Sequence, residues 1–402
     1  MSFWDTEPAK PEFDFDTQKR DLITNMDYLA SMTVEEQTLY KKWVELQEES
    51  MIKNKSQIAE LYDVQWTPTD INNLEQTIKE IQEIEPYVEI VEGAKNSTKW
   101  TYIRKMIHTM GFVANPGRNV KINVKDRKTG KLLGQISLAS DVTSLGVRDK
   151  YIGWTKDDKF KKGKLNHTTI ASTIVCTQPL GYNFLGGKLI AMMATAPTIR
   201  DYWKKKYGQT LIAVGTTSLY GIHSQYNGIP HYKTLGESAG KISIKPDDKF
   251  YDPWHQWLKE NRSDWYTTAI TNERIRNGES MGVASGPVSG IKQKILSRIF
   301  KECGIKQSQY HHGFKRGVYL AMMYDNGCEF LRDDIPESDL VMKKKFADGV
   351  DNISKWWKKK AIRRYTKLHS ENRLKPEHLY YIDGIGMSWE QMKNNYLKEV
   401  GR

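Results

Sequence analysis

Apolar side chains recur at helical spacing in the first part of the chain. From Asp21 to Ala59 they stand amid Glu, Gln and Lys, which predicts a helical segment. After Thr69 and Asp70, which suit a helix start, they return at three- or four-residue steps until Pro86: Ile71, Leu74, Ile78, Ile81 and Ile84. We therefore predict an acidic helical appendage over residues 1–95, with apolar stripes that serve as packing surface.

The hydrophobic period changes from helical to two at Asn119. Val120, Ile122 and Val124 alternate with polar residues, a turn at 128–130 follows, and the alternation resumes over 132–138, which predicts a β-hairpin. Further strands are predicted at 168–177 and 211–217, with a helix from Leu185 to Tyr207 between them that ends at Gly208. A strand, helix, strand unit with the helix as crossover predicts an α/β arrangement, and the antiparallel hairpin ahead of it makes the sheet mixed.

The rest of the chain divides into an insertion, the end of a core and a tail. Aromatic residues crowd the stretch at about 245–305, which includes an amphipathic helix from Ile291 to Cys303 and which we interpret as an insertion. A strand is predicted from Gly317 to Tyr324, and a helix dense in Lys, Arg and Trp from Phe346 to Leu368. The predicted division is an appendage (1–95), a core (96–335) and a basic, aromatic helical tail (336–402).

Composition limits the classes of protein and of site. The chain has 402 residues, of which 39% are hydrophobic, which excludes wholesale disorder. Its longest apolar runs, such as Leu189 to Ala196, are far shorter than the ~20 residues of a membrane span, so we expect a soluble protein. The 3 cysteines lie far apart, without CxxC, and HExxH is absent. We therefore expect no disulfide framework, no bound metal and a reducing cytoplasmic location.

Charge is distributed unevenly along the chain. The net charge is +12, yet acidic side chains outnumber basic ones about two to one in residues 1–100, and the ratio is roughly reversed in the rest. A basic field captures polyanions, so DNA or RNA is the expected partner. The alternative is solubility, with the acidic part shielding the basic part. The acidic helices themselves could dock a protein partner or mimic DNA.

A glycine-rich turn lies between the strand at 168–177 and the next helix. It reads Gln178-Pro179-Leu180-Gly181-Tyr182-Asn183 and continues to Gly186, Gly187 and Lys188. Glycines let a phosphate approach the backbone, the helix N-terminus supplies partial positive charge, and Lys188 adds a cation. The turn is not a Walker loop, because Leu189 stands where Ser or Thr is required. A phosphate cradle and a tight turn without a ligand remain the two interpretations.

The loop after the strand at 211–217 gathers groups that can exchange protons. They are His223, His231, Tyr232 and Glu237. For each of them a structural role is the alternative.

In the tail, cations are interleaved with aromatic rings between Trp356 and Tyr365. Cations bind phosphates and rings stack on exposed bases, so this stretch indicates nucleic-acid binding better than charge alone. The candidate contacts are Trp356, Trp357, Lys358, Lys359, Arg363 and Arg364. The alternative is an ordinary helix that packs its Trp side chains inward and keeps its Lys face in solvent.

Several blocks of the core resemble the DruA-like domain of Druantia anti-phage systems and occur in the same order. The first blocks are Trp100 through His108-Thr109-Met110-Gly111, Pro116-Gly117-Arg118, Leu133-Gly134-Gln135-Ile136 and Arg148-Asp149-Lys150-Tyr151-Ile152-Gly153-Trp154. Tyr207-Gly208, the segment from Tyr232 to Glu237, and Lys315-Arg316-Gly317-Val318-Tyr319-Leu320 continue the series. The resemblance covers residues 98–335, and the Arg-Asp-x-x-Ile-Gly-Trp block is its most specific part.

DruA-like domains are in turn similar to the phage Mom proteins, which have the core of the GNAT acyltransferases and modify adenine in DNA. The resemblance implies an α+β or α/β fold with a GNAT-like, mixed and mainly antiparallel sheet flanked by helices. It also implies a DNA base-modifying acyl- or related group-transferase, and acyl-CoA or another activated small-group donor. In that fold a Gln/Arg-x-x-Gly-x-Gly/Ala turn holds the donor's pyrophosphate; Gln178 and Gly181 match it, with Asn183 in the third place. Tyr232 would be the general acid or base. An Asp of the Mom pattern has no counterpart here, so Glu237 or Asp149 would replace it.

The resemblance also suggests contacts to DNA. Arg118, Arg148, Lys315 and Arg316 would hold phosphates, and Trp154 would stack on a base flipped out of the duplex. The same fold could instead serve as a non-catalytic DNA-binding module of a defence, packaging or replication assembly, because fold does not determine function. An RNA-directed acyltransferase is a third hypothesis. The expected location is the cytoplasm of a bacterial host.

Overall fold

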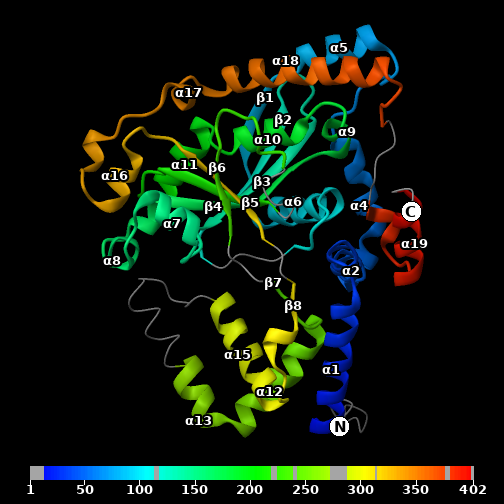
Figure 1. The fold of residues 1–402 in the computed structure, drawn as a ribbon. Coiled ribbons are helices and arrows are strands. Elements are labelled where there is room, and N and C mark those ends of the chain that lie inside the picture. The colour runs from blue at the N-terminus through cyan, green and yellow to red at the C-terminus, as the bar shows by residue number, and fades with distance from the viewer. Residues whose placement is uncertain are drawn as a thin grey trace, which may run out of the picture. The chain divides into compact units, whose positions relative to one another are not determined.

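The computed structural model describes residues 13–112, 117–218, 224–238, 242–271, 288–312, 315–375 and 381–399. The chain forms two compact units (Figure 1). One combines Met1–Gln37 with Lys241–Phe314, and the other combines Thr38–Gly240 with Lys315–Arg402. The division into appendage, core and tail stays a prediction.

The larger unit is built on a seven-stranded sheet with the order β1-β2-β3-β4-β5-β9-β6. The strands are β1 (Pro86–Ile90), β2 (Asn119–Asp126), β3 (Leu132–Ser140), β4 (Thr168–Cys176), β5 (Ala213–Ser218), β6 (Lys233–Glu237) and β9 (Gly317–Met322). Neighbouring strands run antiparallel except β4 and β5, which are parallel. The expected mixed, mainly antiparallel sheet flanked by helices is confirmed.

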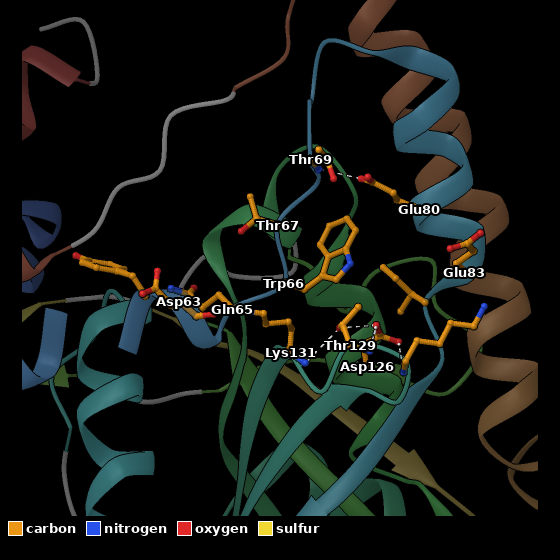
Figure 2. Close-up of a pocket in the computed structure, with 13 residues that line it drawn as sticks. Asp63, Gln65, Trp66, Thr67, Thr69, Glu80, Glu83, Asp126, Thr129 and Lys131 are labelled. Atoms are coloured by element: carbon orange, nitrogen blue, oxygen red, sulfur yellow. Dashed lines mark hydrogen bonds between the residues drawn. The ribbon is translucent and has the colours of Figure 1, made fainter. Parts of the chain in front are cut away.

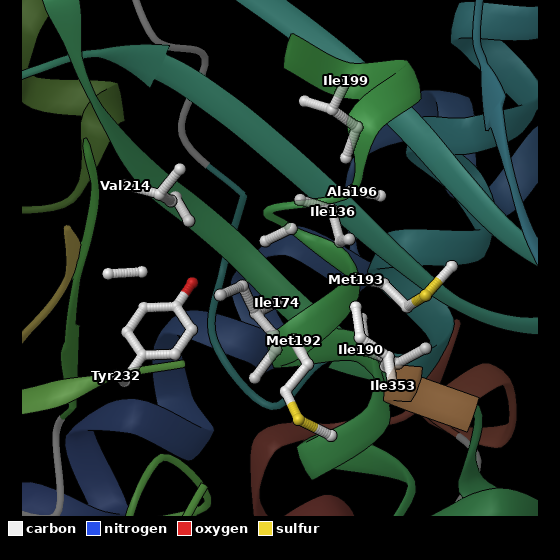
Figure 3. Close-up of a cluster of buried hydrophobic side chains, with 14 of the residues drawn as sticks. Ile136, Ile174, Ile190, Met192, Met193, Ala196, Ile199, Val214, Tyr232 and Ile353 are labelled. Atoms are coloured by element: carbon white, nitrogen blue, oxygen red, sulfur yellow. The ribbon is translucent and has the colours of Figure 1, made fainter. Parts of the chain in front are cut away.

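Helices cover both faces of this sheet. Leu133 and Ile174 pack in one apolar cluster with α10 (Gly186–Met193), whereas their neighbours Leu132 and Val175 belong to another with α6 (Ala94–Ile107). Successive side chains of a strand point to opposite faces, so each strand contributes to two cores. Figure 3 shows the first cluster, where α10 packs on side chains from β3, β4 and β5.

Helix α18 (Gly349–Ser370) lies over α10 and alongside α5 (Leu74–Glu83) (Figure 1). Its buried positions follow the four-residue step of one helix face: Ile353, Trp357, Ala361 and Tyr365. The Trp357 indole Nε1 donates to the Phe184 carbonyl at 2.9 Å, and the Tyr365 ring lies 5.2 Å from the Phe184 ring. The basic helix is therefore anchored on the turn that precedes α10.

Three sequence-based expectations for individual elements were wrong. The helix predicted over 185–207 is two helices, α10 and α11 (Pro197–Tyr207), because Ala196 is extended (ψ 147°) and Pro197 starts a new helix. Strand β1, which pairs with β2, lies in a stretch that was assigned to the helical appendage. The segment from Lys233 to Glu237, expected in the loop after the strand at 211–217, is strand β6.

The remaining elements of the larger unit are short or peripheral. They are the rest of α2 (Val34–Leu46), then α3 (Glu49–Lys53), α4 (Lys55–Ala59), α7 (Gly146–Ile152), α8 (Lys156–Phe160), α9 (Gln178–Gly181), α16 (Gly327–Arg332), α17 (Lys344–Ala347) and α19 (Trp389–Glu399). The helical stretch expected from Asp21 to Ala59 is thus several helices. Among the helices of the described ranges, none is long and apolar enough to cross a membrane.

The smaller unit is helical and aromatic. It contains α1 (Phe15–Ser31), α12 (Tyr251–Asn261), α13 (Ser263–Tyr266) and α15 (Val288–Glu302), with a short hairpin of β7 (Ile242–Ser243) and β8 (His311–His312). The Phe13 ring meets Trp254 at 5.0 Å, and Phe15 meets Trp257 at 5.1 Å. The Asn25 amide donates to Asp247 at 2.8 Å. These contacts join the chain's start to residues of the predicted insertion.

Candidate functional site

The two parallel strands part after a short paired stretch. β4 and β5 pair only at Thr168–Ala213, Thr169–Val214 and Ile170–Gly215. Beyond that point side chains replace the ladder: the Thr216 hydroxyl donates to the Ala171 carbonyl and the Gln225 amide to the Ile174 carbonyl, each at 3.2 Å. We call this opening the β4–β5 gap. Ligands of open sheets bind beyond the carboxyl ends of parallel strands, so the gap is the first place to seek a site.

The predicted phosphate cradle lies at one side of this gap. A Cβ on Gly187, at the start of α10, would stand 2.0 Å from Gln225 Oε1, and one on Gly186 would stand 2.5 Å from the Leu180 carbonyl oxygen. Lys188 donates to the carbonyls of Gln225, at 3.3 Å, and Asn227. Close packing therefore explains both glycines, and in this structure the Gln225 side chain is what approaches the start of α10. Phosphate binding here stays a prediction.

The other predicted cradle residues have structural contacts. Gln178 donates through its amide to the Ile107 carbonyl at 3.2 Å, and Gly181 lies against Cys176. Asn183 forms a two-point clamp on Lys375: its Nδ2 donates to the Lys375 carbonyl at 2.9 Å, and its Oδ1 accepts from the Lys375 N–H at 3.1 Å. The clamp holds the segment after α18 against the turn.

Cations and rings from these distant segments meet on one surface. The Tyr182 ring is 39% exposed, with the Arg364 guanidinium 4.6 Å and the Lys375 ammonium 4.8 Å from its centroid. Arg364 Nε also donates to the Tyr182 carbonyl at 2.7 Å. One turn earlier on α18, the Lys360 ammonium is 5.8 Å from the Trp356 ring. Burial and then the charge of Lys360 lower the pKa of Lys188, so these two cations face the same region.

We name this set the Tyr182 surface: Tyr182, Lys188, Trp356, Lys360, Arg364 and Lys375. Sequence reasoning selected Lys188, Trp356 and Arg364 in two separate motifs and missed Tyr182, Lys360 and Lys375. An aromatic residue inside a glycine-rich turn was the available signal for Tyr182. No local signal marked Lys375, because only the Asn183 clamp brings it to the turn.

The other tail candidates separate by helix face. Trp357 is fully buried, so the inward-packing interpretation holds for that residue. Lys358 points the opposite way from the Tyr182 surface and donates to the Gln82 carbonyl of α5 at 2.7 Å. Lys359 and Arg363 are exposed. Their contact with DNA stays a prediction.

Tyr232 lies in the apolar cluster beside the β4–β5 gap. Its side chain is 8% exposed, and its hydroxyl has no hydrogen-bond partner among the described residues. In Figure 3 that hydroxyl is directed toward Ile174 of β4 and Val214 of β5. Burial, followed by the nearby Tyr226, raises the pKa of Tyr232 far above its ordinary value. The phenol is therefore neutral at physiological pH, which suits donation of a hydrogen bond.

The other proton-exchange candidates do not join Tyr232 in a catalytic cluster. Glu237 is five residues along β6, about 16 Å away at strand spacing, and is exposed near Lys315, at 4.0 Å. His231 is buried edge-on against Phe346, and burial followed by Lys345 lowers its pKa to about 4. His223 lies outside the described residues.

The Arg-Asp-x-x-Ile-Gly-Trp block forms a buried ionic staple. Arg148 is 1% exposed and pairs with Asp141 and Asp149, each at 2.6 Å. The second Asp149 oxygen accepts from Lys159 at 2.6 Å, and these hydrogen bonds overcome burial to lower the pKa of Asp149. Trp154 is buried beneath Arg148 and donates to the Leu331 carbonyl at 2.6 Å. Arg148 and Trp154 are therefore buried in this structure, and both Asp149 carboxylate oxygens accept hydrogen bonds.

Three predicted phosphate contacts lie elsewhere in the larger unit. Arg118 is partly exposed, donates to the Asn166 carbonyl at 2.8 Å and stacks over Tyr207 at 5.2 Å. Lys315 is exposed, and Arg316 next to it is partly buried at the start of β9. Their role in binding phosphates stays a prediction.

Comparisons with known proteins agree with the resemblance noted in the sequence. The family described as "Druantia protein DruA" matches residues 36–333. A curated Druantia protein DruA from Escherichia coli (strain UMEA 4076-1) is 26% identical over 269 residues, which cover 61% of this chain and 61% of that protein. The matched region thus spans less than two thirds of the relative's length. No solved structure matches the chain.

Proposed function

The chain belongs to the DruA family of anti-phage defence proteins, and we propose that it binds DNA and transfers a small group to a DNA base. The observation that carries the proposal is that one short turn, residues 178–188, contributes both to the Tyr182 surface and to the edge of the β4–β5 gap. A polyanion on the cations of that surface would lie next to the buried Tyr232 phenol.

The Tyr182 surface has the chemistry of a nucleic-acid contact. Its four cations, Lys188, Lys360, Arg364 and Lys375, supply the salt-dependent attraction to phosphates, while Tyr182 and Trp356 offer rings on which bases stack. Arg364 and Lys375 already lie over the Tyr182 ring, so the cations are held in place before a ligand arrives. DNA is the proposed partner, with RNA as the alternative to be excluded.

The transfer step would take place in the β4–β5 gap. The proposed donor is acyl-CoA or another activated small-group donor, whose phosphates would lie at the start of α10 near Lys188. The residues fit such a group only after Gln225 leaves Gly187, because the two are in contact here. Tyr232 would then donate its hydrogen bond to the reacting group. The GNAT-like and Mom-like relationships belong to this proposal.

A non-catalytic DNA-binding protein of the same defence family is the second candidate. One observation favours it: within the described ranges, neither predicted carboxylate lies with Tyr232 beside the gap, because Asp149 is in the buried staple and Glu237 is at the far end of β6. A transferase would then need its base from elsewhere, whereas a binding protein needs none.

DNA binding is tested with a double substitution on α18. K360A/R364A should weaken binding of a fluorescent duplex at least tenfold and reduce the salt slope of log affinity by about two. The matched control is K53A/K161A, which removes two exposed lysines of the larger unit. Equal affinity of the two double variants would contradict the proposal, and tighter binding of structured RNA would redirect it to RNA.

Group transfer is tested by mass spectrometry of nucleosides from cells that express the protein or its Tyr232→Phe variant. The hydroxyl has no partner, so the variant should fold as stably as the wild type. An adduct that is present with the wild type and absent with Tyr232→Phe supports the transferase. Unmodified DNA from cells in which the protein binds DNA supports the non-catalytic candidate.

A further inference from the structure

A pocket of about 350 Å³ lies between strand β1, the first turns of α18 and the start of α11. Residues 84–88 form one wall, and the other is formed by Val350, Asp351, Ser354, Lys355 and Lys358 of α18. Arg127, which directly follows β2, and Thr198 of α11 also line it. Lys355 and Lys358 are on the other flank of α18 from the Tyr182 surface, so the pocket is a separate site.

The wall that carries Arg127 is held in place by hydrogen bonds. The Arg127 N–H donates to the Glu85 carbonyl at 2.8 Å, and the Asp126 carboxylate accepts from the Glu85 N–H at 2.8 Å. Asp126 also accepts from the Thr129 hydroxyl at 2.6 Å, within the hairpin turn of Figure 2. The start of β1 and the hairpin turn are therefore joined, and the pocket is formed before a ligand arrives.

Positive charge is in excess in the lining. Its carboxylates are Glu85 and Asp351, and its cations are Arg127, Lys355 and Lys358. Glu85 is already paired with Lys128, 3.9 Å away and outside the lining, which offsets its charge. Asp351 then remains against the three cations, so the pocket attracts an anion.

Two of these cations are open to a ligand. Arg127 and Lys355 are exposed, and neither has an ion-pair partner in the described part of the chain. The Arg127 guanidinium lies over the Tyr87 ring, 5.0 Å from its centroid, which orients it at the pocket. A planar guanidinium in a fixed position suits the oxygens of a phosphate.

A helix start and a hydroxyl add neutral donors. Helix α11 begins at Pro197 without a capping side chain, so its first turn, which includes Thr198, keeps unpaired N–H groups and partial positive charge. Ser354 is 8% exposed and lines the pocket, and its hydroxyl has no hydrogen-bond partner within the described ranges. That oxygen is not sealed from solvent, so a ligand in the pocket can bond to it.

Together these groups have the chemistry of a phosphate site. Guanidinium, ammonium, hydroxyl and helix-start N–H groups all donate to phosphate oxygens. Asp351 would be left without a partner by a bare anion, but it can accept from a hydroxyl or amine of a larger ligand. The volume is in the range of pockets that bind small molecules.

We propose that this pocket binds a phosphate monoester that also carries hydrogen-bond donors, the chemistry of a mononucleotide. Arg127, Lys355, Thr198 and Ser354 hold the phosphate, and Asp351 accepts from a donor on the rest of the ligand. A 5′-phosphorylated DNA strand end offers the same group, so the source is either a free mononucleotide or a strand end. The proposal does not depend on DNA binding at the Tyr182 surface.

The test is isothermal titration calorimetry of the full chain with AMP and with adenosine, which lacks the phosphate. AMP should bind, and adenosine should bind at least about tenfold more weakly. R127A/K355A removes both exposed cations and should weaken AMP binding at least about tenfold. K53A/K161A is the matched control and should bind AMP as the wild type does.

A second variant blocks the pocket without threatening the fold. Thr198→Glu places a carboxylate where the phosphate would lie, whereas a negative charge in the first turn of α11 stabilises that helix. It should lose AMP binding to the same extent as R127A/K355A. AMP binding that both variants keep overturns the proposal.

Duplexes with and without a 5′ phosphate identify the source of the ligand. If AMP does not bind, a preference for the phosphorylated duplex that R127A/K355A loses assigns the pocket to a strand end. Absence of both AMP binding and that preference overturns the proposal. K360A/R364A should keep AMP binding, so a failure of the Tyr182 surface as a DNA contact is seen separately, as unchanged duplex affinity in that variant.

Discussion

Replacing Arg148 with Met should destabilise the protein strongly and leave the DNA affinity of the folded protein unchanged. Arg148 is a basic residue in the most specific block of the family resemblance, so its residue type suggests a DNA contact. Its guanidinium is instead enclosed by Asp141, Asp149 and the Trp154 ring. The variant therefore separates a structural role from a binding role.

The expected loss of unfolding free energy depends on the partners that Asp141 and Asp149 retain when Arg148 is replaced. Asp149 retains Lys159 at 2.6 Å, but Asp141 retains only the Thr168 hydroxyl, at 2.6 Å, and the Val142 N–H, at 2.8 Å. Removing one partner of a buried ion pair costs about 3–5 kcal/mol, and because Met fills much of the Arg volume we expect about 3 kcal/mol. Asp141→Asn in the same chain should recover at least about 1 kcal/mol, because the buried charge is then gone.

The cost should also depend on pH. Burial raises the pKa of Asp141 above its ordinary value, and Arg148 opposes that rise. Without Arg148 the pKa rises further, so the folded variant binds a proton more tightly than the unfolded chain does. The contribution of Asp141 to the stability of the variant is then greatest in acid and falls as the pH rises through the folded pKa. The deficit of Arg148→Met should therefore shrink toward low pH.

Urea unfolding followed by tryptophan fluorescence and circular dichroism measures these free energies. Lys161→Ala, which removes one member of an exposed pair with Asp157, is the control and should cost less than about 0.5 kcal/mol. A loss of less than about 1 kcal/mol of unfolding free energy in Arg148→Met would refute the claim that the buried ion pairs of Arg148 stabilise the fold. So would weaker DNA binding by the folded variant.

Three further predictions concern the core of the larger unit. Trp357→Ala should cost about 3–5 kcal/mol in urea unfolding, whereas Trp356→Ala should cost under about 1 kcal/mol and weaken DNA binding; similar stabilities would be inconsistent with the helix faces described. The pKa of His231, lowered to about 4, should make stability fall by up to about 3 kcal/mol between pH 6.5 and 4, since the unfolded chain binds the proton more tightly; His231→Phe should remove that part of the acid dependence, and equal slopes would count against it. Gly187→Ala should cost about 1–3 kcal/mol in thermal unfolding because its Cβ meets Gln225, and Gln225→Ala should restore the loss unless another contact causes it.

Elements with a local pattern could be predicted from the sequence. The β2–β3 hairpin has strict alternation, and β4 and β5 are rich in small and β-branched residues. Strand β1 could not be predicted in the same way, because its five residues follow a helix directly and its pairing with β2 is a distant contact. The break between α10 and α11 had a local signal, Pro197, but the apolar periodicity across it led to the prediction of one continuous helix.

The candidate site was predicted in two halves that only the tertiary structure joins. The turn at 178–188 and the helix dense in Lys and Trp each had a local pattern. Their meeting depends on contacts such as Asn183 to Lys375 and Phe184 to Trp357, which no short pattern encodes. Residue type without a supporting pattern was also misleading. Arg and Trp are typical of nucleic-acid contacts, yet Arg148 pairs with the buried Asp141 carboxylate and Trp154 donates to the Leu331 carbonyl.

The Asn183 clamp affects how relatives of this protein can diverge. The match to the family ends at residue 333, whereas α18 and Lys375 lie beyond it. A fragment cut at that boundary would uncover Phe184 and the apolar face of α10, and exposed apolar surface of that kind promotes aggregation. Exchange of this tail between family members would succeed only where the recipient's turn and α5 complement the incoming helix. The last part of the chain is therefore expected to be inherited together with the sheet and not as a separable module.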